Sequence, residues 1–172
     1  MPELLDWGYR ALVDKDGLTT GLPAPTRTAH IPARPTEREY LAVVEEFWWE
    51  STYVGKNLWR DDLMQAKYNI DVVMRHEVLL QMLEWRIELD HNWTRKPGPA
   101  GKGLKRYLPP DLWAELEKTW VGAGIEENWT ALFAMTAFFR RVATEVASAL
   151  GYTYPSALDQ GVTAYLEKAR SC

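Results

Sequence analysis

One stretch of the sequence, residues 45–62, carries side chains whose types and spacing could bind a polar ligand. A carboxylate, two aromatic rings and two cations recur there every three to four residues, as Glu46, Trp49, Tyr53, Lys56 and Arg60. In a helix this spacing places them in line along about four turns. A fully solvated face seldom includes Trp and Tyr, and a buried face seldom includes unpaired Lys and Arg, because burying an unpaired charge costs several kcal/mol or more. The mixture is therefore typical of a wall of a polar ligand cleft.

Another face of the same helix has the pattern of a buried stripe. Apolar or small residues recur there at spacings of three and four, as Tyr40, Val44, Phe47, Ser51, Val54 and Leu58. This stripe allows a second interpretation, an ordinary amphipathic helix whose long cationic side chains reach solvent at the rim of a Trp-rich core. The residue pattern alone favours the amphipathic helix over the ligand cleft.

Length and composition restrict the class of protein. The 172 residues suffice for one domain with a hydrophobic core. With 20 Lys and Arg against 24 Asp and Glu, the net charge of −4 argues against nucleic-acid binding and fits a cationic ligand better. No apolar run has membrane-spanning length and no signal-peptide pattern is present, so we expect a cytoplasmic protein without membrane association. Cys172 is the only cysteine, and His30, His76 and His91 lack metal-ligand spacing, so we expect no internal disulfide and no metal site.

The first 35 residues differ from the rest of the chain. Residues 1–17 are typical of a short helix or strand followed by a turn, and no later segment offers a partner strand. Within them, Asp14-x-Asp16-Gly17 indicates a polar turn more than a metal site. Residues 18–35 contain Pro23, Pro25, Pro32 and Pro35, which predict an extended and stiff linker. Residues 1–17 therefore look cut from a sheet, or they pack as an extended arm.

The central helix has recognisable local signals. Thr36-x-x-Glu39 predicts a capping box at its start, with Glu37 favourably placed at the positive N-terminal end. Gly55 is the weak position in the helix, and it predicts either a kink or the close approach of a ligand or a backbone.

The remainder of the chain also has helical periodicity. A second long helix is predicted after residue 62, then a basic loop rich in Gly and Pro over residues 93–110, which lacks the spacing of a phosphate-binding loop. Further helices are predicted from Pro110, from Glu126 to Gly151, and from Ser156. The fold class is therefore predicted to be an all-α bundle of about five helices preceded by the proline-rich arm. The second and last helices are expected to bury Leu63, Ala66, Ile70, Val73, Leu80, Leu83, Ile87, Leu158, Val162, Tyr165, Leu166 and Ala169.

The central stretch resembles the signature of the aminoglycoside 6-adenylyltransferases, the streptomycin-modifying nucleotidyltransferases. The run that carries the resemblance is Glu46-Phe47-Trp48-Trp49-x-Ser51-x-Tyr53-Val54-x-Lys56-x-Leu58-Trp59-Arg60. Similar segments extend over nearly the whole chain, among them Arg60-Asp61-Asp62-Leu63, Ala66-Lys67-Tyr68, Trp129-x-Ala131-Leu132-Phe133 and Val162-Thr163-x-Tyr165-Leu166. This resemblance favours the ligand cleft over the amphipathic helix.

The resemblance also implies a domain organisation. Members of the family are considerably longer, and their N-terminal nucleotidyltransferase α/β domain has a Gly-Ser motif and paired aspartates that hold Mg²⁺. This sequence has no Gly-Ser pair and no such aspartates before the linker. We therefore expect residues 1–17 to be the remnant of that domain, residues 18–35 to be the linker, and residues 36–172 to be the helical substrate-binding domain.

The resemblance implies that a hydroxyl of an aminoglycoside attacks ATP and accepts AMP, which gives antibiotic resistance. Lys56 and Arg60 are then expected to contact the nucleotide, and the aminoglycoside is expected to meet the side chains Glu46, Trp49, Glu50 and Tyr53. ATP and Mg²⁺ would be cofactors of the full-length protein, neither bound tightly by this chain alone. The catalytic base is not identified, because related enzymes place a Glu where this sequence has Thr52.

Two hypotheses are open for the chain as a whole. In the first, it is the C-terminal part of such an enzyme, inactive alone, with aminoglycoside and ATP as its partners through the missing domain. In the second, it is a stand-alone helical interaction module that forms a homodimer or docks on a separate nucleotidyltransferase.

Overall fold

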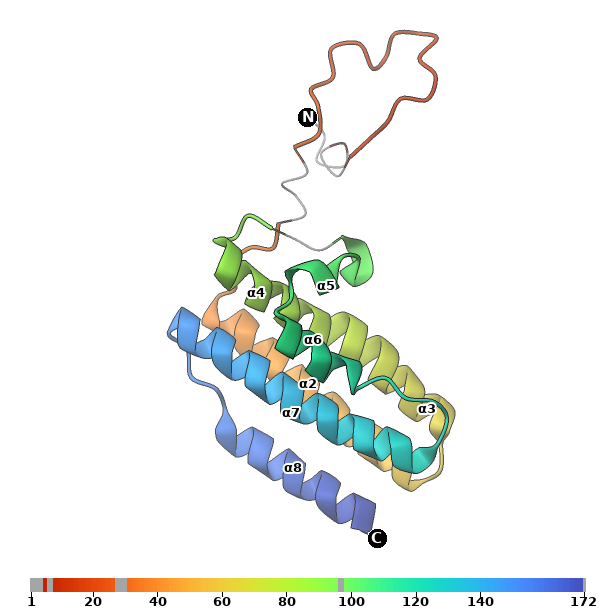
Figure 1. Cartoon of the computed structure of the whole chain (residues 1–172), viewed down its shortest axis with the longest axis vertical. Helices are drawn as coiled ribbons and strands as arrows, with labels where there is room; N and C mark the ends of the chain where they lie inside the picture. Colours follow the sequence, from red (N-terminus) through yellow and green to blue (C-terminus); the bar gives the residue numbers. More distant parts are fainter. Residues whose placement is uncertain (1–4, 6–7, 27–30, 96–97, 172) are drawn as a thin grey trace.

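The computed structural model describes residues 5, 8–26, 31–95 and 98–171, and regular structure in these ranges is helical. They contain no strand, only an isolated bridge between Gly98 and Lys102. The predicted all-α class is therefore confirmed. Helices lie side by side in a bundle, and residues 8–26 lie beyond one end of it (Figure 1).

Helix α2 (Glu37–Trp59) begins at the predicted capping box. The backbone N–H of Glu39 donates to the Thr36 hydroxyl at 3.3 Å, and the backbone N–H of Thr36 donates to the Glu39 carboxylate at 2.7 Å. These hydrogen bonds from Thr36 hold the pKa of Glu39 below its ordinary value. The cap satisfies backbone donors that the first turn would otherwise leave without partners.

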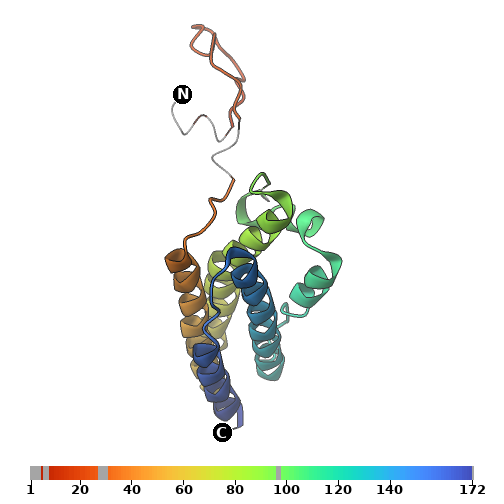
Figure 2. The same cartoon turned by 90° about the vertical axis from the view of Figure 1, so that its left-hand side faces the viewer.

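Helix α2 is the element around which the bundle packs. It lies against α8 (Ser156–Ser171), the π-helix η2 (Tyr68–Leu79) and α7 (Ile125–Leu150) (Figures 1 and 2). The Phe47 ring stacks on Phe139 of α7 at 3.7 Å, and the Tyr40 hydroxyl donates to the Ala143 carbonyl at 3.0 Å. Every residue of the predicted buried stripe of α2 is buried.

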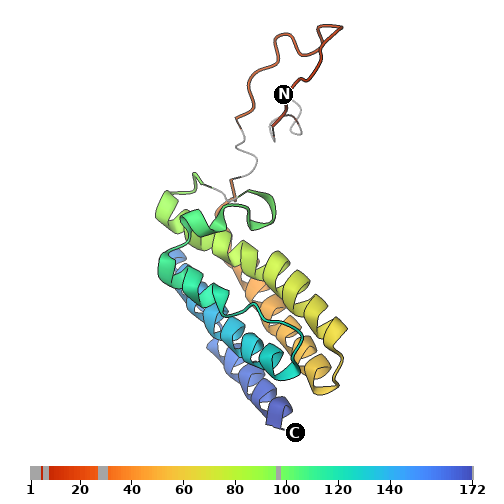
Figure 3. The same ribbon diagram turned by 45° about the vertical axis from the view of Figure 1, so that its right-hand side comes forward.

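The second long helix is one rod made of three parts. It consists of α3 (Leu63–Lys67), the π-helix η2 and α4 (Leu80–His91), and it runs alongside α2 (Figure 3). A π-helix bonds residue i to i+5, so its turns are wider than those of an α-helix. Buried residues accordingly occur as adjacent pairs four to five positions apart, at 69/70, 74/75, 78/79 and 82/83.

Part of the buried stripe that the sequence predicted for the rod is wrong. Ala66, Ile70, Leu83 and Ile87 are buried as expected, whereas Leu63, Val73 and Leu80 are only half-buried. The sequence allowed a break near residues 69–71 but did not place it, and the stripe was predicted with one α-helical period. That period fails for Val73 and Leu80, which lie within or just after η2, whereas Leu63 is the first residue of α3.

The loop after α4 contains short helices, η3 (Pro99–Gly101) and α5 (Leu104–Tyr107), before α6 (Pro110–Glu117) packs on α7. Helix α7 ends at Gly151, which has the left-handed conformation (φ 78°) that the sequence predicted for a C-cap. The described chain therefore has more helical elements than the expected five, because the rod is divided and the loop contains two short ones.

The segment before the bundle contains a turn and no regular element between residues 8 and 26. The carboxylate of Asp14 accepts from the backbone N–H groups of Leu18 at 2.8 Å and Thr19 at 3.0 Å, which is the predicted polar turn. The Tyr9 hydroxyl donates to the Pro23 carbonyl at 3.0 Å and so closes the segment on itself. His30 and Cys172 lie outside the described residues.

A polar cluster fastens α8 to the bundle. The guanidinium of Arg140 on α7 makes an ion pair with both oxygens of Asp159 on α8, and Asp159 is 3% exposed. The Tyr154 hydroxyl donates to Asp159 at 2.9 Å and accepts from the indole N–H of Trp48 at 3.2 Å. Burial alone would raise the pKa of Asp159, but hydrogen bonds from Arg140, Tyr154 and Thr163 outweigh it and hold the pKa below its ordinary value.

Gly55 marks a second contact between α2 and α8. A Cβ atom at this position would lie 2.5 Å from Cδ2 of Leu166 and 3.5 Å from the ring of Trp129. Helix α2 continues through Gly55 without a break, so of the two predicted roles the close approach is observed, and the approaching group is a buried side chain of α8.

We expect Gly55→Ala to destabilise the protein. Alanine favours a helix by about 1 kcal/mol over glycine, but the fully buried Leu166 has little room to move, and overpacking costs about 1–3 kcal/mol. Gly161→Ala in α8 is the matched control, because its Cβ would meet open space, and it should be neutral or stabilising. Urea denaturation measures the free energy of unfolding of both variants. A more stable Gly55→Ala variant would contradict the packing argument.

We expect Asp159→Asn to lower the free energy of unfolding by about 1–3 kcal/mol at pH 7, because Arg140 loses its charged partner. The folded-state pKa of Asp159 is lowered, so its stabilising contribution is present above the unfolded pKa and is lost as pH falls through the folded pKa. The difference between variant and parent should therefore shrink below about pH 4. Asp90→Asn, at an exposed ion pair with Arg86, is the control and should change stability little. A difference that does not depend on pH would contradict this role.

Candidate functional site

The residues that the sequence predicted to contact a ligand all lie on α2 or at its C-cap, Arg60. Trp49 is 60% exposed and Tyr53 is 37% exposed, although both are large aromatic residues. Glu46 and Arg60 are also exposed, and Glu50 and Lys56 are half-buried. The structure thus brings the six residues to one accessible side of the helix.

Three of these side chains contact one another in a row. The rings of Trp49 and Tyr53 meet edge to face at 5.9 Å, and Nζ of Lys56 lies 4.2 Å from the centre of the Tyr53 ring. A cation over a ring face gains about 0.5–2 kcal/mol, depending on solvent exposure. The row forms because positions 49, 53 and 56 are separated by one helical turn each.

Glu50 differs from the others because it is held by a neighbouring helix. Its carboxylate accepts from the side-chain amide of Asn69 on η2 at 2.7 Å. The carbonyl oxygen of the same amide accepts from Gln65 at 3.1 Å. Glu50 therefore links α2 to the rod.

Lys56 and Arg60 open onto a cleft of about 400 Å³ between the C-terminal ends of α2 and α8. The sequence pattern did not predict the other side chains of this cleft, Trp59, Tyr165, Lys168 and Ala169. Tyr165 was expected to be buried with the apolar stripe of α8, but it is 44% exposed, and Leu158 is 37% exposed. Leu166 is the buried residue of that stripe.

The cleft is cationic. Lys56, Arg60 and Lys168 all line it, and no described carboxylate lies within 4 Å of any of their nitrogens. Arg140 and Arg141, by contrast, are paired with carboxylates. Unpaired Lys and Arg side chains around one concave surface attract anions, and phosphate is the anion that such groups bind best in proteins.

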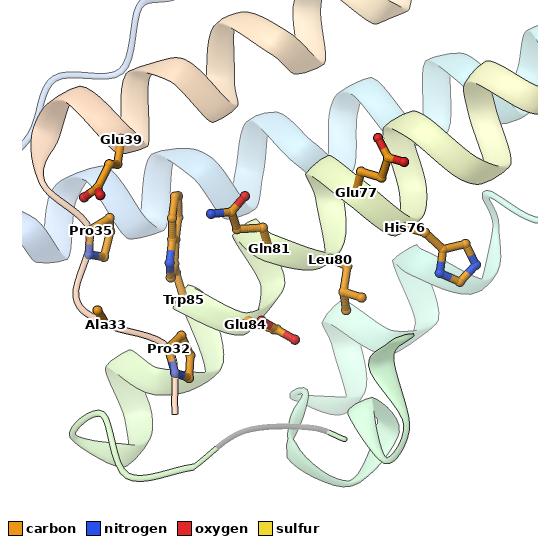
Figure 4. Close-up of a pocket in the computed structure, with 10 residues that line it drawn as sticks. All are labelled: Pro32, Ala33, Pro35, Glu39, His76, Glu77, Leu80, Gln81, Glu84 and Trp85. Carbon is orange, nitrogen blue, oxygen red and sulfur yellow. The ribbon is translucent and has the colours of Figure 1, made fainter. Parts of the chain in front are cut away.

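A separate pocket of about 400 Å³ lies where residues 32–35 pass over η2 and α4 (Figure 4). It is lined by Glu39, Glu77 and Glu84 beside His76 and the Trp85 ring. It contains none of the predicted ligand residues, and the carboxylate of Glu39 is already engaged in the helix cap. The predicted site and this pocket are therefore distinct places on the molecule.

Among the predicted ligand residues, Glu46 and Glu50 carry carboxylates able to accept a proton, whereas Thr52 cannot serve as a base. Thr52 donates its hydroxyl to the Trp49 carbonyl at 2.7 Å, so it is held against its own helix. No group of three or more His, Cys, Asp or Glu side chains that could hold a metal ion occurs among the residues the structure describes. No helix in that part of the chain is long and apolar enough to cross a membrane.

The chain is similar to a group of known proteins. A family model described as streptomycin adenylyltransferase matches residues 3–169. The aminoglycoside 6-adenylyltransferase of Bacillus subtilis (strain 168) is 35% identical over 158 residues, which are 92% of this chain and 55% of that protein. The protein of the same name from Campylobacter jejuni is 33% identical over 146 residues, which are 85% of this chain and 50% of the relative.

The similarity extends to a solved structure. The crystal structure of an aminoglycoside 6-adenyltransferase from Bacillus subtilis matches with a TM-score of 0.75 and 36% sequence identity, over 81% of this chain and 52% of that one. The chain therefore spans about half the length of the curated relatives it matches.

We expect Lys56→Ala to change the free energy of unfolding by no more than about 0.5 kcal/mol, because the side chain is partly solvated and has no ion pair among the described residues. Arg140→Ala is the matched control and should cost several times more, because it leaves the buried carboxylate of Asp159 without its cation. Denaturant unfolding measures the free energy of unfolding of the two variants. If Lys56→Ala costs as much as Arg140→Ala, then Lys56 has a structural role.

Proposed function

Because the chain belongs to the streptomycin adenylyltransferase family, we propose that it is the helical, substrate-contacting part of an aminoglycoside 6-adenylyltransferase. Such an enzyme transfers AMP from ATP to an aminoglycoside hydroxyl and gives resistance to the antibiotic. The observation that carries the proposal is the accessible row Trp49, Tyr53 and Lys56 beside the cationic cleft, within the region that the family model matches.

The proposed division of the surface follows from ligand chemistry. Streptomycin-type aminoglycosides are cationic and rich in hydroxyl groups, so carboxylates and ring faces suit them. Glu46, Trp49, Glu50 and Tyr53 supply these groups. Lys56 and Arg60 supply charge to the phosphates of ATP, where negative charge develops on the leaving pyrophosphate. Lys56 lies where the two sets of residues meet.

In the reaction, the oxygen of the aminoglycoside hydroxyl forms a bond to the α-phosphorus of ATP, and the bond from that phosphorus to the pyrophosphate oxygen breaks. The hydroxyl proton passes to a carboxylate base, which is either on the α2 surface, as Glu46 or Glu50, or in the nucleotidyltransferase domain. The described residues provide no metal-binding cluster, so the Mg²⁺ used by such enzymes would be held by other residues. The α2 surface contributes binding, orientation and charge.

This proposal assigns residues 1–17 to the remnant of a nucleotidyltransferase α/β domain, residues 18–35 to a linker and residues 36–172 to the substrate-binding domain. Support comes from the relatives, because the parts of them that match this chain make up only 55% and 50% of their length. A protein of this organisation needs both parts for AMP transfer, because the reacting atoms lie between them.

We expect the chain alone to bind streptomycin weakly and to transfer no AMP from ATP. Trp49→Ala should weaken binding about fivefold, the loss of roughly 1 kcal/mol of ring contact, and Glu46→Gln should weaken it as well. Calorimetric titration measures binding, and transfer of radiolabelled AMP measures activity. Glu77→Gln in the separate pocket is the matched control and should bind as the parent does.

Two results would contradict the proposal. If Glu77→Gln lowers streptomycin affinity and Glu46→Gln does not, then the aminoglycoside binds in the other pocket. If the parent chain does not bind streptomycin at millimolar concentrations, then an interaction module explains the chain better.

A further inference from the structure

The cleft between α2 and α8 has more cationic groups than the sequence indicated. Lys56 and Arg60 are contributed by α2, and Lys168 is contributed by α8, more than 100 residues later in the chain. We propose that the cleft is a subsite for an oligophosphate chain in which Lys168 is the third cation and the rings of Trp59 and Tyr165 are the walls. That the oligophosphate belongs to a nucleotide substrate rests on the function proposed above, whereas the anion site itself does not.

The charges of the cleft are the first support for this proposal. Three cationic side chains line one concavity, and none has a carboxylate partner in the part of the chain that the structure describes. Such neighbours repel one another unless an anion lies between them. The nearby Arg170 shows the alternative, because it lies two residues beyond Lys168 and pairs with Glu126 at 3.1 Å. Lys168 therefore keeps its charge available on the side of α8 that lines the cleft.

The aromatic walls of the cleft are the second observation that supports the proposal. Trp59 is 57% exposed and Tyr165 is 44% exposed, and each presents its ring beside the cations. Large exposed aromatic residues are common at binding surfaces, because their bodies are apolar and one end is polar. The volume of about 400 Å³ is within the range of small-molecule sites.

The position of Lys168 is fixed by packing. Leu166, two residues earlier, is fully buried against the bare backbone at Gly55 and the ring of Trp129. This contact sets the distance between α8 and α2 just before the cleft, so that a cation of α8 lies opposite Lys56 and Arg60. Lys168 is therefore placed by the fold, although it is far from α2 in sequence.

A second explanation of Lys56 and Lys168 is that they only stabilise their own helices. Lys56 and Lys168 lie in the last turns of their helices, where cations interact favourably with the negative end of the helix dipole. If that is their whole role, removing either charge lowers stability and leaves anion binding unchanged.

The test is a titration of the whole chain with sodium tripolyphosphate, monitored by two-dimensional NMR of the Trp indole N–H signals. The Trp59→Phe variant identifies the Trp59 signal among the nine Trp residues. We expect tripolyphosphate to shift that signal with saturation, and Lys168→Gln to weaken the affinity about tenfold, as loss of one charge-assisted phosphate contact does. Sodium sulfate at equal ionic strength should cause no saturable shift.

Two controls make the result specific. Lys105→Gln removes an exposed lysine elsewhere on the molecule and should leave the affinity for tripolyphosphate unchanged. Adenosine and ATP show whether the cleft binds the phosphate chain or the nucleoside. We expect ATP to bind with the same dependence on Lys168, and we expect adenosine not to shift the Trp59 signal.

The proposal is overturned if tripolyphosphate does not shift Trp59, or if Lys168→Gln lowers the melting temperature and leaves the affinity unchanged, as the dipole explanation requires. It is also overturned if adenosine alone saturates the cleft. Binding of tripolyphosphate that depends on Lys168, in a chain that does not bind streptomycin, would support the anion site and contradict the aminoglycoside function, so the two proposals fail separately.

Discussion

The contact between Leu166 and Gly55 is the constraint on which the candidate site depends. Because Gly55 has no side chain, α8 can approach α2 closely enough for Leu166 to be buried against Trp129. The cleft opens beyond this contact, where the side chains of Trp59 and Tyr165 line it. The missing side chain at Gly55, about one turn before the end of α2, thus lets α8 lie close to the cations that follow it.

The second attachment of α8 is polar and lies at the other end of that helix. Asp159 is buried, and Arg140, Tyr154 and Thr163 all donate to it. A buried ion pair of this kind contributes more to a unique arrangement than to net stability, because its desolvation offsets much of its attraction. Helix α8 is consequently held by an apolar contact near the cleft and by a charged one near its first turn. Together they fix its direction along α2.

Much of the fold was predictable from local signals. The capping box at Thr36, the buried stripe of α2 and the left-handed Gly151 each depend on residues close in sequence. The exposed side of α2 was also recognisable, because Trp49 and Tyr53 share it with charges. Lys168 was not predictable as part of the site, because only the packing of α8 brings it beside Lys56. The partly exposed Val73 and Leu80 were missed for another reason: the residue types allowed a break near residues 69–71 but did not show that the helix has a π-helical period from Tyr68 onwards.

The π-helical part of the rod has a consequence for how related chains can differ in length. Each turn of η2 contains more residues than an α-helical turn, so η2 fixes how α4 is rotated relative to α3. Deletion or insertion of one residue within η2 would turn the whole of α4 about its axis and move Met82, Leu83 and Ile87 out of the core. The loop from Asn92 to Gly103 has no such effect on the orientation of α6, because the loop and α6 do not form one continuous helix. Homologous chains should therefore keep the length of the rod and vary in the length of this loop.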